Sequence, residues 1–322
     1  MPARSLAPRI SLVALAALFL ACQDNTVTVE PLYDATGVAG PEAALTGTIA
    51  FSQSDGRFFQ IFVMNADGSG VRQLTHDSVH SYAPTWSPDG KQIAFFRSGI
   101  FVRSGIFVMN ADGSDVVQIT SRGGWPAWSP NGRQLAFNAQ NGGISVMNPD
   151  GSGVTPLTTG VFASDDRVIS TDYYPSWSPD GKQIAFDREM GDGALQELFV
   201  VESDGSGVTQ ITHSDPGVRF PGRPGWSPNG RRIVFSANQQ LDGTYTNFYR
   251  IFTANPDGSG ILQLTSGDNL DVMPAWSPSG RRIMFVRYPT SMFVMNEDGS
   301  EPTQLADFPG GDPVWTAHHL AP

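Results

Sequence analysis

The sequence contains very little cysteine, lysine and arginine, and it has no apolar run long enough to cross a bilayer. Among its 322 residues Cys22 is the only cysteine, which excludes a disulfide framework and a cysteine-rich zinc site. The 20 lysines and arginines stand against 31 aspartates and glutamates, which gives a net charge of -11. This balance argues against nucleic acid or an anionic membrane surface as a partner, because both require a basic surface.

Turn-forming and apolar residues are plentiful instead. The chain has 35 glycines and 24 prolines, together about 18% of its residues, where an average protein has roughly 12%. Hydrophobic residues make up 40% and aromatic residues 11% of the chain, which is enough to build a core. The composition therefore predicts a folded, turn-rich protein rather than a disordered one.

The N-terminal residues resemble a secretion signal. A basic stretch precedes an apolar run over residues 10–21, which is shorter than the roughly 20 residues that span a bilayer. The run ends at Cys22, as in bacterial lipoprotein signals, whose cysteine is lipidated; an ordinary cleavable signal with an incidental cysteine is the alternative. We expect a signal peptide over residues 1–21, lipid attachment at Cys22 and a tether over residues 22–46.

Two short motifs recur along the rest of the chain. Asp-Gly-Ser occurs six times, and Pro-x-Trp also occurs six times, with its tryptophans about 46 residues apart on average. The Asp-Gly-Ser copies begin at Asp67, Asp112, Asp150, Asp204, Asp257 and Asp298. The Pro-x-Trp copies end at Trp86, Trp128, Trp177, Trp226, Trp276 and Trp315. Repeats of this length are typical of solenoids and of propellers.

Local patterns favour a propeller. Five of the tryptophans begin a Trp-Ser-Pro-x-Gly motif followed by a short apolar run, such as residues 93–95, and no helical period intervenes. Proline and glycine stand at the positions that a tight turn requires in Ser87-Pro88-Asp89-Gly90. Four strands in each of six units predict an all-β fold, a six-bladed β-propeller of four-stranded blades over residues 47–322.

The phase of the repeats predicts how the ring closes. The repeats begin with a second-strand sequence, Ile49-Ala50-Phe51, and end with a first-strand sequence, Pro313-Val314-Trp315. The C-terminal strand should therefore complete the N-terminal blade, which leaves no unpaired strand edge at the junction.

These repeats resemble those of TolB-type β-propellers, whose units read Trp-Ser-Pro-Asp-Gly-Lys-x-Ile-Ala-Phe and Asn-x-Asp-Gly-Ser. The resemblance covers residues 47–316. It implies a propeller that contacts peptidoglycan-associated lipoprotein or another protein of the cell envelope. TolB also has an N-terminal α/β domain, which we expect to be absent here, so the resemblance favours the propeller more than the specific role of TolB.

The connections within the repeats differ in how constant they are. Seven residues separate each Trp from the next strand in five units, and eight separate each Asp of Asp-Gly-Ser from the end of the fourth strand in all six. The other two connections vary in length. Because strands alternate in direction, the constant turns should share one face and the variable connections the other. We expect a partner to meet the variable face, since binding residues concentrate on variable loops.

The residues before each Pro-x-Trp motif should lie near the mouth of the channel on the variable face. They are Ala83, Trp125, Tyr174, Arg223, Met273 and Asp312. Aromatic residues and arginine suit recognition, although these side chains could also simply plug the inner strands. The repeat tryptophans themselves are interpreted as packing residues. The predicted binding residues are Tyr82, Trp125, Tyr173, Tyr174, Arg219, Arg223, Asp271 and Asp312.

Motifs for catalysis and for metal binding are missing. The sequence has no His-Glu-x-x-His and no Gly-x-Ser-x-Gly, and the Asp-Gly-Ser turns lack the spacing of an EF-hand. The acidic residues Asp165, Asp166 and Asp172 are interpreted as a solvated loop. We therefore expect no metal and no cofactor. Resemblance to propeller-type oligogalacturonate lyases leaves a metal-dependent carbohydrate-active enzyme as the alternative, with His80 and His213 as the available ligands.

The sequence thus predicts a non-catalytic binding module, lipid-anchored in the bacterial cell envelope and either periplasmic or associated with the outer membrane. Gln23 after the cysteine weakly favours the outer membrane. We expect a monomer that recognises an envelope protein or peptide and contacts the membrane only through Cys22. A local duplication repeats residues 97–102 as residues 103–108, and we expect the spare copy to bulge from the variable face.

Overall fold

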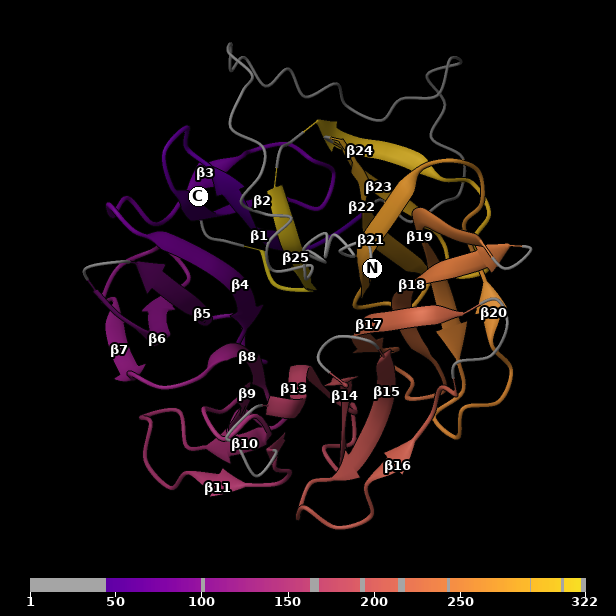
Figure 1. The fold of residues 1–322 in the computed structure, drawn as a ribbon. Helices are drawn as coiled ribbons and strands as arrows, with labels where there is room; N and C mark the ends of the chain where they lie inside the picture. The colour runs from indigo at the N-terminus through magenta and orange to yellow at the C-terminus, as the bar shows by residue number, and fades with distance from the viewer. Residues whose placement is uncertain are drawn as a thin grey trace, which may run out of the picture.

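The computed structural model describes residues 45–99, 102–162, 168–191, 195–213, 218–241, 244–289, 291–307 and 310–319. Within these ranges every regular element is a β-strand, and the strands form six sheets around a central channel (Figure 1). None of the described segments forms a helix long and apolar enough to cross a bilayer. The expected signal peptide, Cys22 and all but the last two tether residues lie outside the described residues.

Blades 1 to 3 comprise the first half of the ring together with the C-terminal strand. Blade 1 contains, from the channel outward, β25 (Gly310–Thr316), β1 (Thr48–Ser54), β2 (Phe59–Asn65) and β3 (Arg72–Gln73). Blade 2 contains β4 (His80–Trp86), β5 (Gln92–Gly99), β6 (Val102–Asn110) and β7 (Val117–Thr120). Blade 3 contains β8 (Gly124–Trp128), β9 (Leu135–Asn138), β10 (Ile144–Met147) and β11 (Thr155–Pro156).

Blades 4 to 6 follow in sequence order. Blade 4 contains β12 (Val161–Phe162), β13 (Val168–Trp177), β14 (Gln183–Met190), β15 (Leu195–Glu202) and β16 (Thr209–Gln210). Blade 5 contains β17 (Arg219–Trp226), β18 (Ile233–Leu241), β19 (Thr244–Ala254) and β20 (Leu262–Gln263). Blade 6 contains β21 (Leu270–Trp276), β22 (Arg282–Tyr288), β23 (Ser291–Asn296) and β24 (Thr303–Asp307).

The ring closes as the sequence predicts. Strand β25 pairs antiparallel with β1, with Thr48 opposite Thr316, so the C-terminal strand completes the N-terminal blade. The Thr48 hydroxyl also donates a hydrogen bond to the His318 carbonyl at 2.9 Å. The prediction of a six-bladed propeller is confirmed. Blade 4 differs from the predicted four strands because the short β12 adds a fifth, pairing Val161 with Ser170.

The two constant turns lie side by side on one face. In all five Ser-Pro-x-Gly turns the glycine N–H donates to the serine carbonyl at 2.8–2.9 Å, and the Asp-Gly-Ser turns close in the same way at 2.9–3.0 Å. The two turn types also bond to each other, as where Ala111 N–H donates to the Lys91 carbonyl at 2.8 Å. We call this side the uniform face and the opposite side the variable face.

One oxygen of each Asp-Gly-Ser carboxylate accepts hydrogen bonds within its own turn. In the first copy Asp67 Oδ1 accepts from the Ser69 amide at 2.9 Å and from the Ser69 hydroxyl at 2.6 Å. Hydrogen bonds from the serine lower the pKa of the corresponding aspartates Asp112, Asp150, Asp204, Asp257 and Asp298. The motif therefore forms the hairpin turn that the sequence predicts.

Inter-blade packing explains the repeated tryptophans and phenylalanines. Trp86, Trp128, Trp177 and Trp276 retain only 8–9% exposure and belong to the hydrophobic clusters between blades. The phenylalanine of each second strand stacks on one from the third strand in five blades, at 5.7–5.9 Å between ring centroids. The interpretation of the repeat tryptophans as packing residues is confirmed.

The duplicated hexapeptide is paired within a hairpin, whereas we expected a spare copy to bulge out. Residues 97–99 of the first copy end β5, and Val102 and the second copy lie in β6, with Arg97 opposite Gly105 and Gly99 opposite Val102. The described part of the hairpin has a one-residue register shift between Arg97 and Gly99, and residues 100–101 lie outside the described residues. The extra residues therefore lengthen one hairpin toward the variable face, because an even insertion keeps the alternation of side chains intact.

Candidate binding site

The inner strand of every blade has the same backbone irregularity. The residue before each Pro-x-Trp motif adopts a left-handed conformation with φ between 48° and 57°. These residues are Ala83, Trp125, Tyr174, Arg223, Met273 and Asp312, and we call them the channel ring. Left-handed backbone at a non-glycine residue costs of order 1–3 kcal/mol, so six equivalent cases mark a built-in feature of the inner strands.

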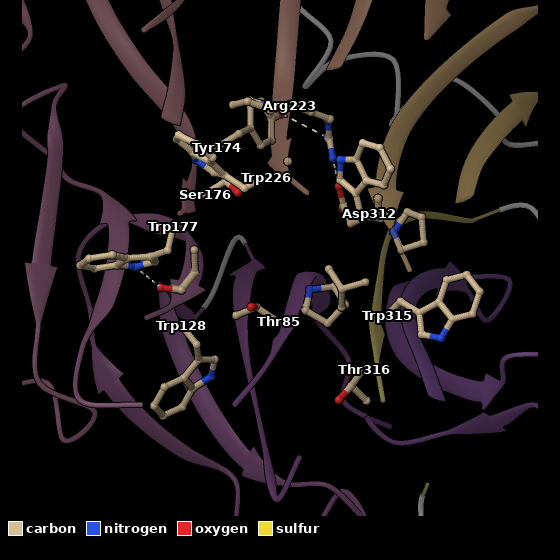
Figure 2. Close-up of a pocket in the computed structure, with 18 of the residues that line it drawn as sticks. Thr85, Trp128, Tyr174, Ser176, Trp177, Arg223, Trp226, Asp312, Trp315 and Thr316 are labelled. Atoms are coloured by element: carbon tan, nitrogen blue, oxygen red, sulfur yellow. Dashed lines mark hydrogen bonds and ion pairs between the residues drawn. The ribbon is translucent and has the colours of Figure 1, made fainter. Parts of the chain in front are cut away.

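The channel ring bridges blades across the channel. Arg223 in blade 5 forms an ion pair with Asp312 in blade 1, which is not its neighbour in the ring of blades (Figure 2). Arg223 Nη2 also donates to the Tyr174 hydroxyl at 3.2 Å, and its guanidinium lies 4.2 Å from the centre of the Tyr174 ring. Both partners of the ion pair are largely buried, with 16% and 13% exposure of their side chains.

The remaining ring members complete this bridge. The Ala83 amide donates to Asp312 Oδ2 at 3.3 Å, and the Asp312 amide donates to Met273 Sδ at 3.2 Å. Trp125 meets Tyr174 edge-on, with centroids 5.4 Å apart. The six ring residues are thus linked to one another across the channel, which is the arrangement expected if they plug the inner strands.

A buried carboxyl group lies beside the ring. Asp187 on β14 is fully buried, and its Oδ2 accepts a hydrogen bond from Gln196. Its Oδ1 has no hydrogen-bond partner among the described residues. Burial raises the pKa of Asp187 to about 7, although Gln196 and Arg223 favour the charged form. Burial, with Asp187 nearby, also raises the pKa of Tyr249 to about 12.

A recess on the other side of the ring opens toward the uniform face. We call this recess, which encloses about 530 Å³, the funnel. The channel ring forms its floor, the Pro-x-Trp segments form its wall, and Thr85, Trp128, Ser176 and Thr316 are among the wall residues shown in Figure 2. Its rim consists of Pro88, Pro130, Pro179, Pro228, Pro278 and His318. Among the inner-strand residues whose side chains are described, none on the variable side of the ring lines the funnel.

Aromatic rings gather on the variable side. Seven half-buried ring side chains from blades 1 to 4 form what we call the aromatic patch: Phe58, Phe59, His80, Tyr82, Phe96, Trp125 and Tyr173. Aromatic side chains provide a large contact area and carry much of the energy at protein interfaces.

Contacts link the patch into one surface. Phe59 lies 5.1 Å from Tyr82 and 6.1 Å from His80, measured between ring centroids. Tyr82 is paired across the strands with Phe96, whose ring stacks on Trp125 at 5.6 Å. Trp125 in turn meets Tyr173 edge-on at 5.5 Å. One surface therefore connects residues that are far apart in the sequence.

The predicted binding residues fall into four groups. Tyr82, Trp125 and Tyr173 belong to the aromatic patch, and Tyr174, Arg223 and Asp312 belong to the channel ring. Asp271 is fully buried, and Arg287 binds both of its oxygens at 2.7 and 2.9 Å, so it is part of the scaffold. The backbone of Arg219 pairs with Asn238, and its side chain lies outside the described part of the chain.

Two of the residues considered for metal binding have other hydrogen-bond partners. His80 Nδ1 accepts a hydrogen bond from the Phe59 amide at 3.1 Å, and burial lowers its pKa. Asp172 is buried and bound by Arg188 at 2.6 and 2.9 Å, whereas Asp165 and Asp166 lie outside the described residues. Within the described ranges no group of three or more histidine, cysteine or acidic residues could hold a metal.

Comparison with known proteins identifies the family. The TolB β-propeller domain matches residues 45–222 and 124–319, which together span most of the chain. The chain belongs to the TolB β-propeller family. It is 44% identical over 50 residues to the Tol-Pal system protein TolB of Anaeromyxobacter dehalogenans. This match spans 16% of this chain and 11% of the length of that relative, so it informs on the repeats alone.

Solved structures share the fold of this family member. The crystal structure of TolB from Acinetobacter baumannii has a TM-score of 0.67 and 21% identity, covering 85% of this chain and 67% of that one. An oligogalacturonate lyase in complex with manganese has a TM-score of 0.54 and 14% identity, covering 80% and 73%. At such identities the likeness concerns the fold alone, which carries both binding proteins and enzymes.

Proposed function

We propose that this chain is a non-catalytic binding module of the bacterial cell envelope that recognises a protein or peptide through the aromatic patch. The observation that carries the proposal is two sets of contacting, half-buried rings on the variable side of the channel, Phe58 to Tyr82 and Phe96 to Tyr173, which the cross-strand pair Tyr82–Phe96 places side by side. Membership in the TolB β-propeller family supports the same class of role.

The physical state of these rings suits recognition. Each ring is held by a neighbouring ring or by its strand, so little side-chain freedom remains to be lost when a partner binds. Each ring also keeps part of its surface exposed, which a partner would bury. Burying apolar area contributes about 25 cal/mol per Å², and aromatic anchors are the residue type that most often dominates binding energy.

The proposed location rests on the sequence. The apolar run ending at Cys22 supports export and lipid attachment, and the net charge of -11 disfavours nucleic acid as a partner. A lipid-anchored monomer would present the propeller at the end of the tether. Export with lipidation would appear as a mature chain that begins at Cys22 and carries a lipid mass on its N-terminal residue, which the Cys22→Ser variant should lack.

Affinity capture from envelope extracts tests the binding function. The immobilised chain is compared with the double variant Phe58→Ala, Tyr173→Ala, which removes two rings at opposite ends of the patch. Each such anchor is worth about 2 kcal/mol in typical interfaces, so we expect at least a 10-fold loss of the captured partner.

A matched control separates the patch from general apolar surface. Val117 and Val154 are 57% and 54% exposed and lie in or beside the outermost strands of blades 2 and 3. The variant Val117→Ser, Val154→Ser should capture the partner as well as the unmodified chain does. Equal capture by the patch variant, with an unchanged circular dichroism spectrum, would refute the proposed surface.

A further inference from the structure

The funnel and the proposed partner surface share one residue, Trp125. The floor of the funnel is the channel ring, and the other members of the aromatic patch lie on the opposite side of that ring. Most of the rim prolines are exposed, including Pro88, Pro130, Pro179 and Pro228, so the funnel is open to solvent on the uniform face. Its volume of about 530 Å³ lies within the range of natural binding pockets.

The N-terminal end of the propeller is fixed beside this opening. The Thr46 carbonyl accepts a hydrogen bond from Trp315 Nε1 at 2.9 Å, and Trp315 is one of the funnel residues. Gly47 has φ of 99°, and a Cβ there would lie 1.9 Å from the Thr316 carbonyl oxygen. Leu45 packs against the cluster shared by blades 1 and 6. The chain preceding Leu45 therefore starts at the edge of the funnel.

The composition of that preceding segment complements the rim. Residues 23–44 contain four acidic side chains and neither lysine nor arginine, with two prolines and the pair Leu32-Tyr33. Each complete Ser-Pro-x-Gly turn at the rim is followed by an exposed cation. These cations are Lys91, Arg133, Lys182, Arg231 and Arg281. Lys91 and Lys182 also lie 3.8 Å from the exposed carboxylates of Asp89 and Asp180 in their own turns, so the complementarity rests mainly on the three arginines. All five cations lie closer to the channel than the Asp-Gly-Ser carboxylates do. The reason is that the Ser-Pro-x-Gly turns join the two inner strands of each blade, whereas the Asp-Gly-Ser turns join the two outer strands.

The wall of the funnel also suits a proline-containing segment. Prolines from all six Pro-x-Trp segments and tryptophans from five of them are among its lining residues, and aromatic-lined grooves are a common way of binding extended proline-containing peptides. The segment is long enough: the 11 residues from Asp34 to Ala44 reach roughly 36 Å at about 3.3 Å per residue. The depth from Ala83 to Pro88 corresponds to roughly 16 Å of strand.

We propose that residues 31–44 of this chain bind in the funnel, with Leu32 and Tyr33 inside it and the acidic residues against the rim cations. The segment then fills the uniform-face opening of the same propeller and fixes the propeller relative to its tether. The variable face and its aromatic patch stay free. The proposal does not depend on which partner the patch binds.

Amide hydrogen exchange of the full chain carrying Cys22→Ser tests this docking. Residues 31–44 should exchange at least 10-fold more slowly in the protein than in a synthetic peptide of the same sequence. The variants Arg231→Glu, Arg281→Glu at the rim and Leu32→Asp, Tyr33→Asp in the segment should each abolish that protection. The matched control Arg57→Glu, Arg122→Glu, which changes two exposed arginines of the variable face, should retain it.

Three outcomes would overturn the proposal. Exchange of residues 31–44 at the rate of the free peptide would show that the segment is not bound. Protection that survives both the rim variant and the segment variant would place the segment elsewhere. Protection that grows with protein concentration would assign the funnel to the tether of a second copy.

Discussion

The buried carboxyl of Asp187 should make stability depend on pH in an unusual direction. The group has no exposure, and one of its oxygens has no hydrogen-bond partner in the described part of the chain. Its pKa of about 7 in the folded protein compares with 3.8 for the unperturbed group, mainly because burial disfavours the charge. Between these two values the folded state holds a proton that the unfolded state has released.

The sign and size of the effect follow from this difference. Because the folded state binds more protons, the free energy of unfolding falls as pH rises from about 4 to about 7, and it levels off above that. A shift of about three pH units corresponds to about 4 kcal/mol at 1.36 kcal/mol per unit, which is an upper bound. The variant Asp187→Asn carries no such proton, so it should lose this slope and be more stable than the unmodified protein at pH 8.

Denaturant unfolding followed by circular dichroism at pH 5, 6, 7 and 8 measures the effect. The informative quantity is the difference between the two proteins, since other carboxyl groups contribute equally to both. Asp204→Asn, at an exposed turn, serves as the control and should leave the slope of the unmodified protein in place. Parallel pH profiles for the unmodified protein and Asp187→Asn, or a less stable variant at pH 8, would refute the reasoning.

Three further predictions concern the scaffold. Deleting residues 311–322 removes most of β25 and should open the ring, lowering the melting temperature of the whole domain; an unchanged melt would contradict the closure. Asp312→Ala leaves Arg223 buried without its ion-pair partner and should cost about 3–5 kcal/mol in denaturant unfolding, and addition of Arg223→Met should recover part of that loss. Gly151→Ala places a Cβ 2.0 Å from the Ile119 carbonyl oxygen and should lower the melting temperature more than Gly132→Ala, where the nearest atom is 3.7 Å away; equal effects would contradict this packing.

The fold could be predicted from the sequence because recurring motifs mark where each repeat begins and ends. The constant spacing from Trp86 to Ile93, found again in every complete unit, fixes a turn of one length and therefore the pairing of two strands. The offset between the first and last repeats fixes the closing pair β1 and β25. Periodicity of this kind can be detected in the sequence without knowledge of any long-range contact.

The location of the channel ring could not be predicted in the same way. The sequence places Arg223 and Asp312 at equivalent repeat positions, but only the structure shows that their side chains meet across the channel. The left-handed backbone at these positions is not signalled by glycine or asparagine, and the residue before a proline is normally extended. The left-handed conformation arises from the packing of the inner strands, so no residue type at the position itself predicts it.

Part of the aromatic patch was missed for a different reason. Phe96 directly follows the phenylalanine of its second strand. At this position four other blades carry a polar residue and the fifth carries a valine: Ser52, Asn138, Asp187, Ser236 and Val286. An alignment of the repeats with one another reveals it as the one aromatic residue at this position. Phe58 and Phe59 have no such signal, because they follow a connection whose length varies from blade to blade.

Site-specific photo-crosslinking of the captured partner tests the central claim most directly. A photoreactive amino acid is introduced at Tyr173 in the aromatic patch and, in a separate variant, at Arg133 on the uniform face. We expect the partner to be cross-linked from position 173 and not from position 133. Cross-linking from position 133 alone would contradict recognition through the aromatic patch.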